Sequence, residues 1–154
     1  MENDKIVIID ARCFIVLEKI GALPLLNKLY LQVVTTTEIA AEYKEDLPTW
    51  ITIQNVINRD LIKTFQNIVD LGESSAIALA NEINHSFIVI DDLQARKFAS
   101  SLGLNVKGTI GVLLEAKQNE VIQTIKPYLD KIQKTNFRIS DYLIVKILES
   151  AGEI

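Results

Sequence analysis

Short hydrophobic runs alternate along the chain with segments in which apolar residues recur at helical spacing. Runs rich in β-branched residues predict strands over residues 5–9, 31–34, 50–56 and 87–90, with a further short strand at 105–107. An uninterrupted apolar run of this length is typical of a strand that is buried on both faces, as in a parallel sheet. Because helical segments separate the runs, their order predicts an α/β fold with a mostly parallel central sheet.

Apolar residues at helical spacing predict the elements between the strands. We expect two short helices within 13–31 that are joined at Gly21, then helices after Thr35–Thr37 and over 60–70. Leu71 and Gly72 are interpreted as a break, after which Glu73 opens the next helix. Later helices are expected up to about Leu102, after Thr109, near 121–133 and near 140–150.

The whole chain, residues 1–154, is predicted to be one domain, because the sequence contains no internal repeat, low-complexity tract or linker. The helices from about residue 121 onward are expected to form an appendage on the same core. The apolar residues of 13–31 and of the last helix fit two alternatives, which are a place in the core and a homodimer surface.

Composition narrows the class of protein. With 49% hydrophobic and 23% charged residues, the chain is too apolar for a disordered protein and too charged for a membrane-embedded one. No window approaches the roughly 18 apolar residues of a membrane span, and the N-terminus lacks the basic and apolar regions of a secretory signal. We therefore expect a cytoplasmic protein that does not associate with membranes.

The charge and the rare residues exclude further classes. A formal net charge of −4 excludes a surface that is basic throughout, although residues 117–146 contain six basic and three acidic residues. Lys117 opens this basic stretch, which is a candidate surface for an RNA backbone. Cys13 is the only cysteine and His85 the only histidine. Intrachain disulfides and cysteine-based zinc sites are therefore excluded, and a Ser-His triad is disfavoured.

Acidic residues follow two of the predicted buried strands. Asp10 ends the first strand, and Asp91 and Asp92 end the fourth. Ligands of open parallel sheets bind at the carboxyl ends of the strands, and Glu42 and Glu73 belong to helices that could face the same edge. Clustered carboxylates repel one another unless a cation lies between them. Oxygen ligands of this kind suit Mg²⁺ or Mn²⁺, and such a cage serves phosphodiester hydrolysis.

Each acid also has a purely structural interpretation. Asp10 could simply end a strand, Glu73 could be favoured by the helix dipole, and Asp91 or Asp92 could cap the following helix. Other enzyme classes built on a strand-end Asp fit less well. A haloacid-dehalogenase-type phosphatase requires an Asp where Arg12 stands, and the sequence contains no glycine-rich phosphate-binding loop.

The sequence resembles a known family over nearly its whole length. The most specific segments are, in chain order, GESSAIALA, IDDLQAR and GTIGVL. They resemble the PIN-domain proteins, and among them a branch classed as a domain of unknown function with VapC-like toxins as relatives. The resemblance implies a three-layer α/β/α fold whose acids bind Mg²⁺ or Mn²⁺ for endoribonuclease activity.

The resemblance also implies roles for individual residues. Those matching the family's catalytic and metal-binding acids are Asp10, Glu42, Glu73 and Asp91, with Asp92 as a further metal ligand. Substrate binding is expected of Arg96, Thr109 and Lys117, of which the first two match family positions. The sequence departs from the family next to Asp10, where a Thr or Ser commonly stands and this chain has Ala11-Arg12. Arg12, if it points inward, would pair with a carboxylate and compete with the metal.

These observations lead to two hypotheses of different classes. The preferred one is a Mg²⁺- or Mn²⁺-dependent endoribonuclease of PIN type that acts on single-stranded or structured RNA. As a relative of VapC-like toxins it would be the toxin of a toxin–antitoxin pair, with an antitoxin protein as its partner. The alternative is a catalytically weakened PIN fold that binds nucleic acid or protein, and Arg12 is the residue that favours it.

Overall fold

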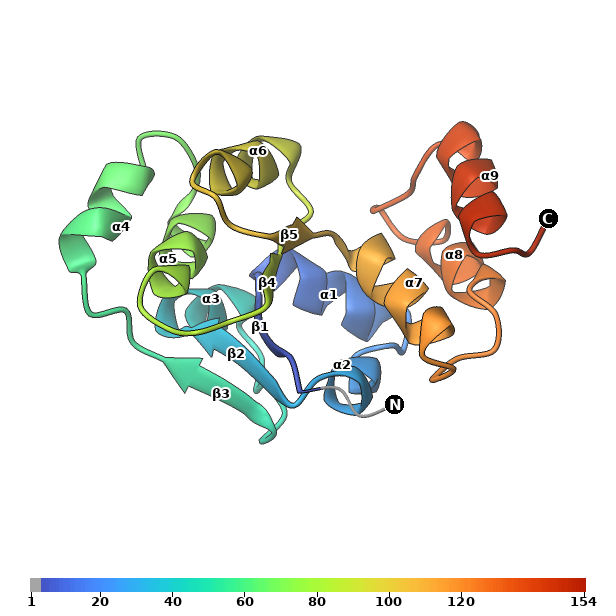
Figure 1. Cartoon of the computed structure of the whole chain (residues 1–154), viewed down its shortest axis with the longest axis horizontal. Coiled ribbons are helices and arrows are strands. Elements are labelled where there is room, and N and C mark those ends of the chain that lie inside the picture. Colours follow the sequence, from blue (N-terminus) through green and yellow to red (C-terminus); the bar gives the residue numbers. More distant parts are fainter. Residues whose placement is uncertain (1–3) are drawn as a thin grey trace.

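A five-stranded sheet with β1 at its centre organises the fold (Figure 1). The structure, a computed structural model, describes residues 4–154; residues 1–3 of the N-terminus, where no secretory signal is expected, lie outside the described residues. The strands are β1 (Ile6–Ile9), β2 (Gln32–Thr36), β3 (Ile51–Gln54), β4 (Phe87–Val89) and β5 (Val106–Lys107). Their order is β3-β2-β1-β4-β5, and every neighbouring pair is parallel. The predicted parallel sheet is confirmed.

Helices cover both faces of the sheet and complete the three layers of the predicted α/β/α fold. They are α1 (Ala11–Lys19), α2 (Pro24–Leu29), α3 (Thr37–Tyr43), α4 (Arg59–Phe65), α5 (Leu71–Ala80), α6 (Leu93–Ser101), α7 (Thr109–Gln118), α8 (Lys126–Ile132) and α9 (Asp141–Ser150). In Figure 1, α1, α2 and α7 lie on one side of the strands and α4, α5 and α6 on the other. Helix α3 packs against both α1 and α5.

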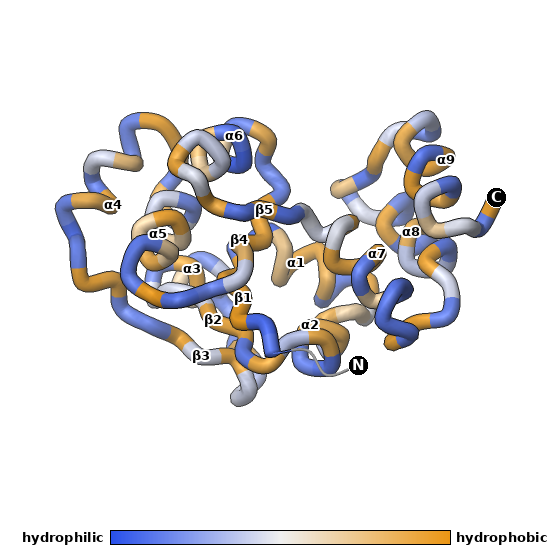
Figure 2. Tube along the Cα trace, in the orientation of Figure 1, coloured by the Kyte–Doolittle hydropathy of each residue, from blue (hydrophilic) through white to orange (hydrophobic). Residues whose placement is uncertain are grey.

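The core is built on strands that are buried on both faces, as the uninterrupted apolar runs predicted. Val7, Ile8 and Ile9 of β1 are fully buried, and the hydrophobic residues in Figure 2 concentrate on the strands and on the helix faces turned toward them. Helix α5 is buried from Gly72 to Ala80, which explains why it lacks a polar face. Phe14 is also fully buried, so the apolar face of α1 belongs to the core and not to a dimer surface.

The last two helices extend from α7 away from the sheet (Figure 1). Ile147 and Leu148 of α9 are buried, whereas Tyr142 at its start is 73% exposed. The helix therefore packs through its second half. None of the helices within residues 4–154 is long and apolar enough to span a membrane.

The strand order creates a crevice at one edge of the sheet. The chain proceeds from β1 outward to β2 and β3, and then returns to β4 on the other side of β1. In open sheets of this kind, ligands bind where the direction reverses, outside the carboxyl ends of the two central strands. Asp10 directly follows β1, and Asp91 and Asp92 follow β4 after Ile90. The acids that the sequence singled out therefore flank the crevice.

Several predicted boundaries were wrong. The helix predicted over 60–70 ends at Phe65, and the one predicted near 121–133 begins at Lys126. Helix α5 begins at Leu71, and Leu71-Gly72 is its first turn instead of a break, because Asp70 caps the helix. Strand β3 ends at Gln54, and Val56 is buried in the loop that follows.

A buried glutamate on α7 links the opposite, amino-terminal edge of the sheet. Glu115 is 5% exposed, and its carboxylate accepts hydrogen bonds from Tyr30 at 2.7 Å, Lys5 at 2.8 Å and Lys107 at 3.0 Å. Burial alone would raise the pKa of Glu115, but these three donors outweigh it and lower the pKa below its ordinary value. The cluster joins α7 to the segments that precede β1 and β2 and to β5.

Replacing Glu115 by Gln is expected to lower the free energy of unfolding by about 1–3 kcal/mol, because Gln lacks the charge that the hydrogen bonds from Lys5 and Lys107 depend on. Chemical denaturation measures the loss. Glu149→Gln is the matched control. Glu149 is half exposed and forms a long surface ion pair with Lys146 at 3.9 Å, and such pairs contribute little to the free energy of unfolding. Equal effects of the two substitutions would contradict a special role for Glu115.

Candidate active site

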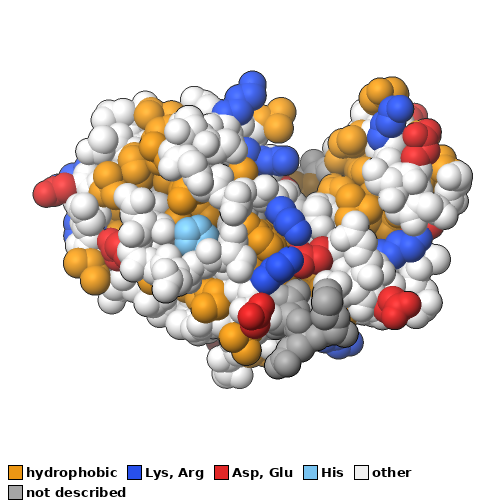
Figure 3. Space-filling model, in the orientation of Figure 1, with side chains coloured by type: hydrophobic (Ala, Val, Ile, Leu, Met, Phe, Trp, Pro, Cys, Tyr) orange, Lys and Arg blue, Asp and Glu red, His pale blue; other side chains and the backbone are white. Residues whose placement is uncertain are grey.

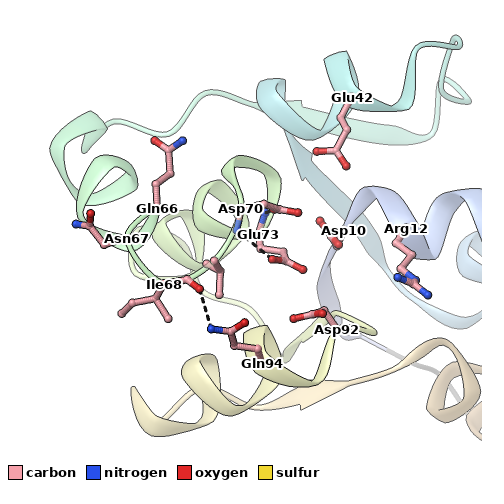
Figure 4. Close-up of a pocket in the computed structure, with 11 residues that line it drawn as sticks. Asp10, Arg12, Glu42, Gln66, Asn67, Ile68, Asp70, Glu73, Asp92 and Gln94 are labelled. Carbon is pink, nitrogen blue, oxygen red and sulfur yellow. Dashed lines mark hydrogen bonds between the residues drawn. The ribbon is translucent and has the colours of Figure 1, made fainter.

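Carboxylates from separate segments surround one open cavity at the carboxyl edge of the sheet. The cavity has a volume of about 510 Å³, and Figure 4 shows the side chains that line it. Its acids are Asp10, Glu42, Asp70, Glu73 and Asp92. Three of the four acids predicted as catalytic residues, Asp10, Glu42 and Glu73, thus lie around the same space.

Two of these acids are held by the ends of the central strands. Asp10 is the N-cap of α1 and only 5% exposed, and its backbone N–H donates to Val89 of β4 at 3.1 Å. Asp92 is the N-cap of α6, and its Oδ2 accepts from the backbone N–H of Ala95 at 2.9 Å. The predicted capping role of Asp92 is therefore real. Its Oδ1 accepts no hydrogen bond from residues 4–154, and Figure 4 shows the side chain beside the cavity.

The start of α5 brings two more acids to the cavity. Asp70 accepts from the backbone N–H of Glu73 at 2.8 Å, and Glu73 accepts in return from the backbone N–H of Asp70 at 3.2 Å. This capping box fixes both side chains on one turn. Asp70 was missed from the sequence, although an Asp three residues before a Glu at the start of an apolar helix is the signal that could have found it.

Glu42 reaches the cavity from α3, opposite Gly72 of α5. A β-carbon on Gly72 would lie 2.7 Å from Glu42 Oε1 and 3.5 Å from Asp10 Oδ1. The glycine of the GESSAIALA segment therefore leaves the space in which the carboxylates of Glu42 and Asp10 converge. A larger residue would push them apart.

Burial and the charges of neighbouring carboxylates raise the pKa of three of these acids, which are Asp10, Glu73 and Glu42. Burial, and then the nearby charge of Glu73, raise the pKa of Asp10 to about 8. Burial, and then the charge of Asp70, raise the pKa of Glu73 to about 7 and also raise that of Glu42. Within residues 4–154, Asp10 has no Lys or Arg within ion-pair distance. A cation in the cavity would relieve this repulsion.

Asp91, which the sequence predicted as a catalytic metal ligand, is directed to a neighbouring cavity. Its two carboxylate oxygens accept from the backbone N–H and the hydroxyl of Thr109, each at 2.7 Å. Arg96 lies close by, since a β-carbon on Gly108 would be 2.9 Å from Asp91 Oδ1 and 3.3 Å from Arg96 Nη1. Asp91 and Thr109 thus fix the start of α7, and Asp92 takes the place at the acidic cavity that was assigned to Asp91.

Arg12 does not pair with the acids, contrary to the possibility raised from the sequence. Its side chain borders the acidic cavity, but its guanidinium lies over the ring of Phe137, 5.0 Å from the ring centroid. In Figure 4 it points away from Asp10. A cation–π contact with the segment before α9 therefore draws Arg12 out of the site that a metal would occupy.

Lys117 also lies elsewhere than predicted. Its ammonium donates to the Glu153 carboxylate at 2.8 Å and to the backbone carbonyl of Ala151, so it secures the end of the chain. The same Glu153 accepts from the backbone N–H groups of Ile125 and Lys126 at the start of α8. These interactions remove Lys117 from the candidate substrate site.

The comparison with known families agrees with this geometry. A family model described as a PIN domain matches residues 6–153. The chain belongs to the PIN-domain family. PIN domains have a nuclease-type fold, generally use divalent metal ions and commonly bind nucleic acids. No curated protein and no solved structure matches the chain.

The acids of this PIN domain fit a hydrated divalent ion better than a tightly enclosed one. Within the part of the chain that the structure describes, no three Asp, Glu, Cys or His side chains are close enough to form a ready-made metal cage. Mg²⁺ dehydrates reluctantly and usually keeps several waters while one or two carboxylates bind it. An open cavity with oxygen ligands and a buried carboxylate that lacks a cationic partner meets these requirements.

The raised pKa of Asp10 makes the stability of the metal-free PIN domain depend on pH. An unfolded Asp loses its proton near pH 4, whereas folded Asp10 keeps it up to about pH 8. The unfolded state therefore binds fewer protons over this window, and stability falls as pH rises from about 4 to 8. We expect Asp10→Asn, measured by denaturation with a chelator, to stabilise the protein at pH 8 by on the order of 2 kcal/mol and to do so less at pH 5.

The control for this prediction is Asp46→Asn, the same change at an exposed position away from the cavity. It is expected to alter neither the stability nor its pH dependence. Destabilisation by Asp10→Asn at pH 8 would mean that the Asp10 carboxylate serves the fold and is not under electrostatic stress.

The close approach at Gly72 gives a second prediction for this PIN domain. Gly72→Ala should preserve or slightly raise stability, because Ala is the better helix former by about 1 kcal/mol. It should weaken Mn²⁺ binding roughly tenfold in calorimetric titration, because the new β-carbon displaces Glu42. Gly111→Ala in α7 is the matched control, since the atoms nearest to a β-carbon there belong to the Lys107 side chain and lie at 3.4 Å or more, an ordinary van der Waals contact. Equal Mn²⁺ affinity in both variants would contradict the role of Gly72.

Proposed function

We propose that the chain is a divalent-metal-dependent endoribonuclease of PIN type. The observation that carries the proposal is the convergence of carboxylates on one cavity at the point where the strand order reverses. They come from α3, from the start of α5 and from the segments that follow β1 and β4. Asp10, Glu42, Glu73 and Asp92 would hold Mg²⁺ or Mn²⁺. The ion would supply positive charge to the phosphate oxygens of RNA as the phosphodiester bond breaks.

The chain's own residues would do the remaining work. Asp70 holds the Glu73 backbone through the capping box, and Asp10 is fixed by the central strand. A carboxylate of this set, with its pKa raised toward neutrality, is suited to accept a proton from an attacking water. Asp91 and Thr109 would be positioning residues, since the hydrogen bond between them fixes the turn that carries Asp92.

A catalytically weakened PIN fold that binds nucleic acid or protein is the second candidate. Arg12 favoured it from the sequence, but the stacking of Arg12 on Phe137 removes that support. Within the first proposal, the resemblance to VapC-like toxins suggests the toxin of a toxin–antitoxin pair. A short antitoxin-like reading frame beside the gene would support that extension.

The deciding experiment is cleavage of a single-stranded RNA in the presence of Mn²⁺. Asp92→Asn should reduce the rate at least about a hundredfold while leaving stability nearly unchanged, because Asn is as good an N-cap as Asp. Asp91→Asn should reduce the rate far less, since the Asp91 carboxylate is engaged by Thr109. Mn²⁺ should raise the melting temperature of the unsubstituted chain and not that of Asp92→Asn.

Two results would argue against the nuclease. One is a wild-type cleavage rate in Asp92→Asn, which would place the activity outside this cavity or in a contaminant. The other is the absence of both cleavage and Mn²⁺-dependent stabilisation in the unsubstituted chain, which would favour the binding module.

A further inference from the structure

A second cavity adjoins the acidic one and has the opposite charge. It has a volume of about 320 Å³ and lies between the sheet and the last two helices. We call it the arginine groove and define it by Arg12, Leu93, Arg96, Phe137 and Arg138. Figure 3 shows a hollow in the molecular surface between the body of the fold and the lobe of α8 and α9, bordered by Lys and Arg side chains.

The arginines of the groove make no ion pair with any residue that the structure describes. This holds for Arg12, Arg96 and Arg138. Among residues 4–154, Asp91 is the only acid that lines the groove, and both of its oxygens accept from Thr109. Because a guanidinium stays charged at every relevant pH, the groove is positive although the chain has a net charge of −4. Its occupant must be an anion.

The rest of the lining is apolar and partly exposed. Leu93 is 67% exposed and Leu143 is 42% exposed, and the half-buried Phe137 lines the groove with the cations of Arg12 and Lys19 over its ring. Arginines that bind phosphates, next to apolar and aromatic side chains on which bases stack, are the features that bind single-stranded nucleic acid. A duplex hides the faces of its bases from such a surface.

The groove lies next to the acidic cavity, and Arg12 lines both. A strand in the groove would therefore lead directly to the carboxylates. An acidic peptide meets the charge requirement of the groove equally well. Such a peptide has no flat base to place against Phe137. If it continued past Arg12, its own carboxylates would be repelled by those of the acidic cavity.

We propose that the arginine groove binds the nucleotides next to the cleaved phosphate of a single-stranded RNA. This inference rests on the proposed nuclease function and extends it to the substrate path. The segment from α8 to α9 then forms one wall of the substrate site, with Phe137 as a stacking platform and Arg138 as a phosphate contact.

The test measures the affinity of the full chain for a labelled, unstructured RNA oligonucleotide by fluorescence anisotropy, with a chelator present to prevent cleavage. Arg138→Gln should weaken binding roughly tenfold and reduce the slope of log affinity against log salt by about 0.7 to 1. Phe137→Leu should weaken binding about five- to tenfold without changing the slope. Lys28→Gln, an equal charge change at an exposed position of α2 outside the groove and outside the basic stretch 117–146, should change neither quantity.

A duplex of the same sequence should bind more weakly and should not respond to Phe137→Leu. Several outcomes would overturn the proposal: unchanged RNA affinity and slope in Arg138→Gln, a loss for the duplex equal to that for the single strand, or a response to Arg138→Gln seen only with a poly-glutamate peptide. Because Arg138 is exposed, its substitution leaves the fold intact, and equal melting temperatures of the variants verify this.

Cleavage assays separate this inference from the nuclease proposal. If the groove guides substrate, Arg138→Gln raises KM roughly tenfold, while kcat and the Mn²⁺-induced rise in melting temperature stay at their unsubstituted values. Unchanged KM together with normal cleavage would reject the groove and leave the nuclease standing. RNA binding that depends on Arg138 and Phe137 without any cleavage would reject the nuclease and support the groove as a binding surface.

Discussion

The burial of Asp10 among other carboxylates is the constraint on which the site depends. Its backbone is fixed by the central strand and by the hydrogen bond to Val89, so the side chain cannot withdraw from Glu73 without disturbing β1. A carboxylate in this position is stable when it is protonated or when a cation is near. The fold therefore retains an unfavourable interaction at one edge of the sheet, as functional sites commonly do.

A comparison with Glu115 shows that burial alone does not decide whether the pKa of a carboxyl group is raised or lowered. Both residues are 5% exposed, but they lie at opposite ends of the sheet. Glu115 has Lys5, Lys107 and Tyr30 as donors, and its pKa is lowered, whereas Asp10 faces Glu73 and its pKa is raised. One end of the sheet is thus closed by a satisfied charge cluster, and the other is left open with unsatisfied charge. Helix α7 joins the two ends, since it begins at Thr109 beside Asp91 and carries Glu115.

The order of the elements, and the acids at the carboxyl edge of the sheet, could be predicted because both depend on local sequence patterns. Buried strands show as apolar runs, and parallel strands bring the residues that follow them to one edge. Side-chain directions could not be predicted in this way. Asp91 and Asp92 are adjacent in the sequence, yet one turns to Thr109 and the other to the cavity.

Residues whose partners are distant in the sequence were the hardest to place. Lys117 is bound by Glu153, 36 residues later, and Arg12 stacks on Phe137 in a segment that belongs to the last lobe of the fold. No local pattern indicates either contact. Asp70 is different, because its capping box with Glu73 joins residues only three apart and can be recognised in the sequence. Interpreting Leu71-Gly72 as a break, instead of as the first turn of α5, hides this signal.

Under the proposed function, the two cavities together would explain how an acidic chain accommodates a polyanion. The acidic cavity would repel phosphate until a divalent ion bound there, whereas the arginine groove would attract phosphate with or without the ion. Arg12 stands between them, and its stacking on Phe137 keeps its charge on the groove side of the boundary. Had Arg12 paired with Asp10, it would have neutralised the cavity in place of a metal and left the groove with one fewer cation. The position of a single aromatic ring on the segment before α9 therefore keeps the negative and positive surfaces separate.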